Sequence, residues 1–314
     1  MHDYTVYGGW LRSAIPIPEL RPMTTVPSED PAAALWQFEL ATSSAPELAN
    51  GIPTGRDELT EGVFAQFIRA PNVARLAFDD TGTFDIVEQG RRIVWYPKDG
   101  SHPDVVRADL IGRVLPLSLH ERGLTALHAS AVVLGTRAIA FVAPKNHGKS
   151  TLAMGLVERH QARLLSDDTL IVSPATGLAE PGVHSIRLWE QTARRFSHLQ
   201  GGRLVLSEKR IFEELPDEWL ADRAVPLAAI YTISPEPADV VEAARRERLD
   251  GAGAAIAMIQ YQKLGALLGG LDAARVFEYA ADLASRVPVY TLHIARDLDR
   301  LGEVTETLVN WHVA

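Results

Sequence analysis

The stretch that decides the fold is residues 143–151, Ala-Pro-Lys-Asn-His-Gly-Lys-Ser-Thr, which lies between an apolar run and an amphipathic one. Apart from its first position, where Ala143 stands in place of glycine, it matches the pattern Gly-x4-Gly-Lys-Ser/Thr of a phosphate-binding loop, or P-loop. The preceding residues 138–142 are typical of a buried strand, and residues 149–160 have the apolar spacing of a helix. A strand, a loop and a helix in this order form the context that the pattern requires.

The chemistry of a P-loop explains these residue types. Backbone N–H groups at the start of a helix bind phosphate oxygens, the lysine charge reaches the β- and γ-phosphates, and the Ser hydroxyl contacts Mg²⁺. Asn146 stands where many P-loops have glycine, and asparagine tolerates a positive φ. The alternative is a helix start capped by small residues, with Lys149 as a surface lysine. The predicted nucleotide site comprises Ala143, Lys145, Asn146, His147, Gly148, Lys149, Ser150 and Thr151.

A pair of carboxylates, Asp167-Asp168, follows Ser150 by 17 residues. A helix of about twelve residues and a short loop use most of that distance, so we expect the pair at the end of the next strand, beside the P-loop. One carboxylate would then face Mg²⁺ or a substrate hydroxyl. Two aspartates suit phosphoryl transfer to an alcohol and favour a kinase over a hydrolase. A solvated Asp-Asp turn is the alternative.

A histidine is expected beside the same loop. Gly135-Thr136 reads as a two-residue hairpin turn that joins strands at residues 125–134 and 137–142. Leu134 would then face Arg137, and counting back along the hairpin places His128 opposite Ala143. A buried structural histidine is the alternative reading.

Three basic residues further along the chain are candidates for contacts with a phosphate or a substrate. Each of them can equally be an exposed surface charge. They are Arg187, Lys209 and Arg210.

Composition limits the classes of function. The 314 residues suffice for about two domains, and 46% of them are hydrophobic. A net charge of −9 argues against a general nucleic-acid partner, and the absence of cysteine excludes disulfides and thiol catalysis. We find no signal peptide, and the most apolar window, residues 124–143, contains His128 and Arg137. We therefore expect a cytoplasmic protein without a membrane partner.

The chain is expected to form two domains. Residues 1–122 predict a β-rich domain, interpreted as a module for substrate recognition, and residues 123–314 predict an α/β domain with a mixed sheet. In the first domain we expect strands at 34–40, 63–69, 73–78, 84–88 and 91–96, loops at 22–31 and 43–55, and a helix at 104–120. In the second we expect helices at 149–160, 255–268, 273–286 and 298–309, and further strands at 163–165, 170–172, 227–233 and 289–294.

Leu-His-Ala-Ser at 127–130, the P-loop and Leu-Leu-Ser-Asp-Asp at 164–168 together resemble the catalytic domain of HPr kinase/phosphorylase. That family phosphorylates a serine of a carrier protein and has a P-loop fold related to phosphoenolpyruvate carboxykinase. The motifs lie within residues 124–175, with weaker similarity to about residue 300. The resemblance implies that Lys149 and Ser150 bind nucleotide phosphate and Mg²⁺. It also implies that Asp167 is the base for the serine hydroxyl, supported by Asp168 and His128.

The chain departs from this family in two places. The glutamate that follows the aspartate pair in the family is not evident, and Glu180 is the nearest candidate; Ser150 and Asp168 are the other metal ligands that we expect. The opening, residues 4–20, looks instead like stand-alone HPr-kinase-like proteins, some of which phosphorylate a serine of lasso-peptide precursors.

The function expected from these residues is that of a serine kinase. It would use ATP and Mg²⁺ to phosphorylate a peptide or a small protein. A small-molecule alcohol kinase and a non-catalytic nucleotide-binding scaffold are the alternatives. The sequence leaves open whether the protein is a homo-oligomer, as it leaves open the nucleotide donor.

Overall fold

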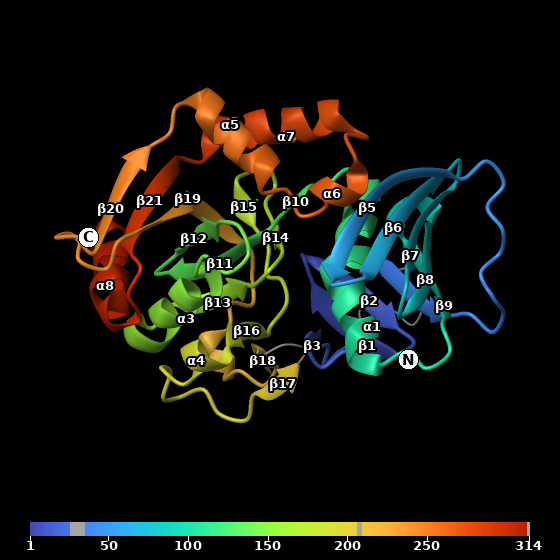
Figure 1. Ribbon diagram of the computed structural model, residues 1–314, viewed down its shortest axis with the longest axis horizontal. Coiled ribbons are helices and arrows are strands. Elements are labelled where there is room, and N and C mark those ends of the chain that lie inside the picture. The colour runs from blue at the N-terminus through green and yellow to red at the C-terminus, as the bar shows by residue number, and fades with distance from the viewer. Residues whose placement is uncertain (26–34, 206–208, 313–314) are drawn as a thin grey trace. The chain divides into compact units, whose positions relative to one another are not determined.

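The computed structural model describes residues 1–25, 35–205 and 209–312 (Figure 1). The contacts between residues divide the chain into two compact units. Unit 1 consists of Met1–Ala126 and Gln262–Val276, and unit 2 of Leu127–Tyr261 and Phe277–Ala314. Residues 262–276 therefore fold with the N-terminal part of the chain, although they come late in the sequence.

Unit 1 contains a sheet of nine strands in the order β3-β1-β2-β4-β9-β8-β7-β6-β5. Its buried face carries large aromatic side chains, among them Trp36, Phe38 and Phe84, all fully buried. The strands are β1 (His2–Val6), β2 (Gly9–Ser13), β3 (Arg21–Pro22), β4 (Trp36–Leu40), β5 (Ile52–Thr60), β6 (Val63–Ala70), β7 (Val73–Phe78), β8 (Gly82–Val87) and β9 (Arg92–Pro97).

The strands predicted in unit 1 are confirmed, with ends that differ by at most two residues; residue 34 lies outside the described residues. The predicted loop at 43–55 is wrong at its end, because β5 begins at Ile52. This strand lies at the edge of the sheet and buries none of its side chains, so it lacks the alternating apolar pattern that marks a strand. Of the predicted loop at 22–31, residues 26–31 lie outside the described residues.

The predicted helix at 104–120 is confirmed as three successive helical segments. These are α1 (Pro103–Asp109), a π-helical turn (Leu110–Val114) and α2 (Leu115–Glu121). Pro116 is tolerated because it lies in the first turn of α2, where its missing N–H is not needed. In the C-terminal segment of unit 1, α6 (Gly265–Leu268) packs on β5 so closely that a Cβ at Gly55 would lie 2.1 Å from the Leu267 carbonyl oxygen.

Unit 2 is built on a mixed sheet in the order β13-β11-β12-β19-β21-β20, with β15 paired to β19. The pairs β12–β19 and β19–β21 are parallel, and β11–β12, β11–β13 and β20–β21 are antiparallel. The predicted hairpin is the pair β11–β12, and the sheet is mixed, as expected. The strands are β11 (Ala129–Leu134), β12 (Arg137–Val142), β13 (Arg163–Ser166), β15 (Leu178–Ala179), β19 (Val225–Glu236), β20 (Ala244–Arg248) and β21 (Val289–Ala295).

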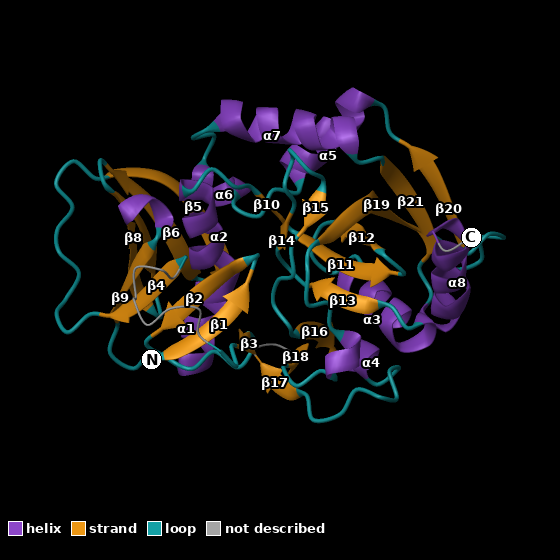
Figure 2. Cartoon of the chain, turned by 180° about the vertical axis from the view of Figure 1, so that it is seen from behind, coloured by secondary structure: helices purple, strands orange, loops and turns teal. Residues whose placement is uncertain are grey.

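Helices cover both faces of this sheet (Figure 2). Successive residues of β11 point to opposite faces: Val132 packs in the core with α3 and α8, and Val133 in the core with α5 and α7. This two-sided burial explains why the strands read as continuous apolar runs. The helices are α3 (Lys149–His160), α5 (Gly251–Gln260), α7 (Ala273–Arg286) and α8 (Leu301–His312).

Two predicted elements that cross the boundary between the units are interrupted, one at His128 and the other after Tyr261. The strand predicted at 125–134 breaks into β10 (Ala126–Leu127) and β11, and the helix predicted at 255–268 breaks into α5 and α6. The backbone N–H of His128 donates to the Tyr261 carbonyl oxygen at 2.7 Å, so both residues leave their regular elements to bond to each other. The prediction of one continuous helix at 255–268 is therefore wrong.

The remaining parts of unit 2 are short. A separate three-stranded sheet in the order β16-β18-β17 lies between β15 and β19 in the chain, with α4 directly after β16. The bounds are β14 (Leu170–Ile171), β16 (Ile186–Trp189), α4 (Glu190–Ala193), β17 (Arg203–Val205) and β18 (Lys209–Phe212). None of the helices in the described residues is both long enough and apolar enough to span a lipid bilayer.

Candidate functional site

Two residues of the loop between β12 and α3 have a positive φ. Gly148, the residue before the first turn of α3, has φ 87°, and Asn146 has φ 69°. Asn146 therefore adopts the positive φ that the sequence analysis considered for it. No side chain among the described residues caps α3, so its first N–H groups face the loop uncapped. Thr151 lies half-buried in this first turn. The start of α3 therefore offers N–H donors to an anion.

The first position of the loop accommodates alanine because it faces the core. Ala143 is fully buried among the apolar residues shared by β11, β12 and α3. Its carbonyl oxygen accepts a hydrogen bond from Lys149 Nζ at 2.9 Å, and the Pro144 carbonyl oxygen accepts a second at 3.2 Å. Lys149 is only 8% exposed, so its ammonium group lies along the loop. Lys145 is exposed, and the His147 ring Nδ1 contacts the Lys145 carbonyl oxygen at 2.9 Å.

Asp167 follows the last residue of β13 and meets the start of α3. Its Oδ1 accepts hydrogen bonds from the Ser150 hydroxyl at 2.8 Å and from the Ser130 hydroxyl. Its Oδ2 accepts the backbone N–H of Arg187 at 3.3 Å. Burial raises the pKa of Asp167, and the neighbouring charge of Asp168 raises it further, while the hydrogen bonds act in the opposite direction. The structure therefore brings Asp167 next to the loop serine, at the strand end where the sequence places it.

Asp168 and His128 form the second part of the site. Asp168 has φ 72°, a left-handed conformation that is strained for a residue with a side chain. His128 Nδ1 lies 3.1 Å from Asp168 Oδ1 and 3.1 Å from the Asp168 carbonyl oxygen. Both partners are oxygen acceptors, so we place the ring proton on Nδ1. The Asp168 side chain is 36% exposed, in contrast to the buried Asp167.

The backbone position of His128 differs from the sequence prediction, which paired it with Ala143. The hairpin has the predicted register, from Leu134 opposite Arg137 to Ala129 opposite Val142. The pairing stops there, and His128 is not paired with the first loop position. Its backbone bonds to Tyr261 instead, and its side chain contacts Asp168.

The three candidate basic residues separate onto two faces of the small sheet. Arg187 and Trp189 alternate with Leu188 along β16, and Trp189 is paired directly with Lys209 on β18. Arg187 and Lys209 thus lie on the face that carries Trp189. Arg210 is paired with Leu188 and lies on the other face, where it forms an ion pair with Glu190 and donates to the Gly202 carbonyl oxygen at 2.7 Å. The candidate contact at Arg210 is therefore not brought to the aspartate pair.

Glu180 is the sequence candidate for a further metal ligand, and burial raises its pKa. No group of three or more histidine, aspartate or glutamate side chains among the described residues is arranged to hold a metal ion. A role of Glu180 as a metal ligand therefore stays a prediction.

The residues that are present fit a Mg²⁺ ion held jointly with phosphate. Mg²⁺ prefers oxygen ligands and is usually bound through one or two carboxylates together with substrate phosphates. Ser150 donates its hydroxyl proton to Asp167, which leaves the oxygen lone pairs of Ser150 for a cation. With Asp168 beside it, this gives a donor set made only of oxygen atoms.

Two residues of the site were missed by sequence reasoning. Ser130, fully buried in β11, donates its hydroxyl to Asp167. A serine inside an otherwise apolar strand could have indicated a buried polar contact. Trp189 donates its indole N–H to Asn146 Oδ1 at 3.1 Å. No sequence pattern points to that contact, because the two residues lie 43 positions apart in the sequence.

Comparisons with known proteins give little evidence about the function of this chain. No family model matches it, and no curated protein matches it. Among solved structures, it is distantly similar to the Hpr(Ser) kinase/phosphatase from Coxiella burnetii, with 15% sequence identity over 60% of this chain and 95% of that one. The TM-score of this match is 0.29, so most of the two backbones do not coincide and no residue role is transferred from it.

Proposed function

We propose that the protein is an ATP-dependent kinase that transfers the γ-phosphoryl group to a serine hydroxyl of a peptide or a small protein. The observation that carries the proposal is the hydrogen bond from Ser150, in the first turn of α3, to Asp167, at the end of β13. It joins a P-loop-like helix start to a carboxylate pair, and phosphoryl transfer needs these two parts close together.

The phosphate-binding part is the loop and the start of α3. The uncapped N–H groups of α3 and the ammonium group of Lys149 bind the β- and γ-phosphates. Lys145, exposed on the loop, adds positive charge in a chain whose net charge is −9. Ser150 and Asp168 would hold Mg²⁺, which neutralises charge on the phosphates when bound.

The two aspartates have different roles in this proposal. The sequence suggests Asp167 as the base, but its two oxygens already accept three donors and it is 5% exposed. Asp168 is reachable from solvent, and the His128 ring holds its carboxylate in one orientation. We therefore assign the proton acceptor to Asp168 and the anchoring of Ser150 to Asp167.

The reaction balances with these groups. The serine oxygen attacks the γ-phosphorus while its proton passes to the Asp168 carboxylate. The bond between the γ-phosphorus and the bridging oxygen breaks, and that oxygen leaves on ADP. The preference for a peptide serine as acceptor rests on the motif resemblance at residues 127–130 and 164–168.

The test supplies γ-labelled ATP and Mg²⁺ with serine-containing peptides, small polyols and water as competing acceptors. We expect label on a peptide, at least about a hundredfold less transfer by Asp168→Asn, and unchanged transfer by Asp282→Asn, an exposed aspartate on α7. If Asp168→Asn keeps its transfer rate while Asp167→Asn loses it, the roles of the two carboxylates are reversed.

The same experiment separates the alternatives. Label in the polyol fraction would identify a small-molecule alcohol kinase. Tight binding of ATP with no transfer to any acceptor, in the wild type as in Asp168→Asn, would identify a nucleotide-binding scaffold and overturn the proposal.

A further inference from the structure

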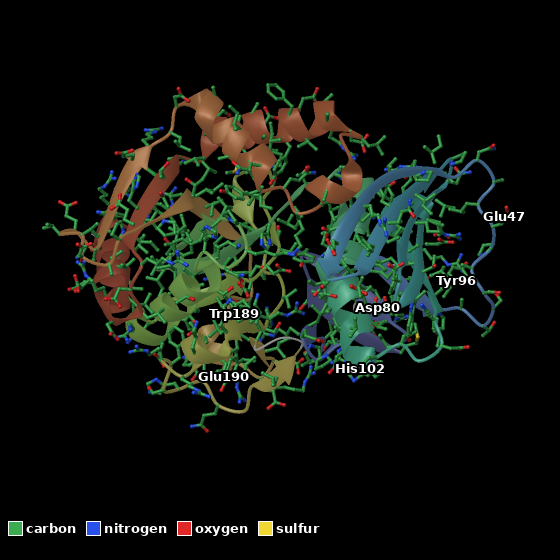
Figure 3. All side chains as sticks on the ribbon, in the orientation of Figure 1. Glu47, Asp80, Tyr96, His102, Trp189 and Glu190 are labelled. Atoms are coloured by element: carbon green, nitrogen blue, oxygen red, sulfur yellow. The ribbon has the colours of Figure 1, made fainter. Side chains whose placement is uncertain are left out.

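Trp189 connects the loop to the small sheet. Its indole N–H donates to Asn146 Oδ1 at 3.1 Å, and the ammonium group of Lys209, its direct partner on β18, lies 4.7 Å from the centre of its ring. Figure 3 labels Trp189 at the end of β16, next to Glu190 at the start of α4. One side chain therefore contacts both a loop residue and a cation from a distant part of the sequence.

The contact with the loop orients a loop side chain. Asn146 has φ 69°, and Trp189 is the hydrogen-bond partner of its side chain within the described residues. The Trp189 N–H therefore holds the Asn146 side chain from outside the loop.

The second contact of Trp189 is with the ammonium group of Lys209. Lys209 forms no ion pair among the described residues, and burial lowers its pKa, as do the charges of Lys145 and Arg187. The carboxylates of Asp168 and Asp167 lie near enough to raise the same pKa. Lys209 is thus a partly desolvated ammonium group beside the aspartate pair, held over an aromatic ring by a cation–π interaction.

We propose that Lys209 is the cation that contacts the transferred γ-phosphoryl group, and that Trp189 is the positioning residue that holds both Lys209 and Asn146. The inference rests on the proposed kinase function and adds a prediction of its own. A cation aimed at the γ-phosphate distinguishes ATP from ADP, whereas the N–H groups of α3 and Lys149 bind the phosphates common to both.

The experiment compares the dissociation constants of Mg·ATP and Mg·ADP by calorimetry. We expect Lys209→Met to lose about tenfold in affinity for ATP with little change for ADP, and Lys209→Arg to restore most of the difference. Arg210→Met is the matched control, because it removes a cation from the neighbouring position of β18 on the opposite face. It should leave the ratio of the two constants unchanged.

Variants of the tryptophan separate its two contacts. Trp189→Phe keeps a ring under Lys209 and removes the N–H, so both nucleotides should bind more weakly by a similar factor. Trp189→Leu removes the ring as well, so the ratio of the ATP and ADP constants should also fall. In the wild type, ATP should change the tryptophan emission because its γ-phosphate meets Lys209 above the Trp189 ring, and this change should be absent in Trp189→Phe.

The outcomes distinguish the two proposals. If the wild type binds neither nucleotide, the kinase proposal and this inference both fail. If the wild type binds ATP but Lys209→Met keeps the ratio of ATP to ADP affinity, the kinase proposal stands and the role of Lys209 is refuted.

Discussion

Ser130 offers the sharpest test of how the site is built. Its hydroxyl is completely buried in β11 and donates to Asp167, which has two further donors. Ser130→Ala would leave a buried carboxylate with one donor fewer. A hydrogen bond to a charged group contributes about 1.5–3 kcal/mol, so we expect the free energy of unfolding of unit 2 to fall by about 2 kcal/mol.

Ser166→Ala is the matched control. Ser166 is also completely buried, adjoins Asp167 in the sequence and donates its hydroxyl to the Thr169 carbonyl oxygen, a neutral acceptor. Its loss should cost about 1 kcal/mol. Urea unfolding followed by circular dichroism, together with hydrogen exchange of the β11 and β13 amides, measures both variants and assigns the loss to unit 2.

A double-mutant cycle with Asp167→Asn completes the test. In the asparagine background the acceptor is neutral, so Ser130→Ala should cost only about 1 kcal/mol, which leaves a coupling free energy of about 1 kcal/mol. A cost of Ser130→Ala no larger than that of Ser166→Ala, or an equal cost in both backgrounds, would refute a specific role for Ser130 in stabilising the carboxylate.

Two further predictions concern unit 2. The Tyr231 hydroxyl lies 2.7 Å from His312 Nε2, and burial lowers the pKa of His312 to about 4, so the unfolded chain binds the proton first as pH falls. As the pH falls from about 6.5 to 4, the free energy of unfolding should therefore decrease by up to about 1.4 kcal/mol per pH unit. Urea midpoints measured over this range should show a smaller pH dependence in His312→Gln, which lacks the titrating ring. Gly148→Ala places a side chain at φ 87° and should cost about 1–2 kcal/mol. A melting temperature equal to that of the wild type would contradict this strain.

The elements next to the loop were predictable from sequence because several local signals agree there. The bounds of β12 and α3 match the expectation, since an apolar run, a Gly-Lys-Ser sequence and a helical spacing meet within residues 137–160. The position of Asp167 followed from chain length alone. The edge strand β5 was missed because it buries none of its side chains and carries no pattern.

The contacts within the site were harder to predict, because they join residues far apart in the sequence. The hydrogen bond between Trp189 and Asn146 spans 43 residues and joins β16 to the loop before α3. His128 leaves its strand because its N–H bonds to Tyr261, more than a hundred residues away, and no local propensity encodes that partner. The sequence therefore indicated candidate residues, and the contacts between them came from the structure.

The most direct test of a phosphate-binding loop at residues 143–151 is the calorimetric titration of Mg·ATP into wild type and Lys149→Met. The wild type should bind one nucleotide, Lys149→Met should bind at least about tenfold more weakly, and Lys98→Met, an exposed lysine of unit 1, should match the wild type. Equal affinity in Lys149→Met and wild type, or no binding by the wild type, would contradict the assignment of this loop to phosphate binding.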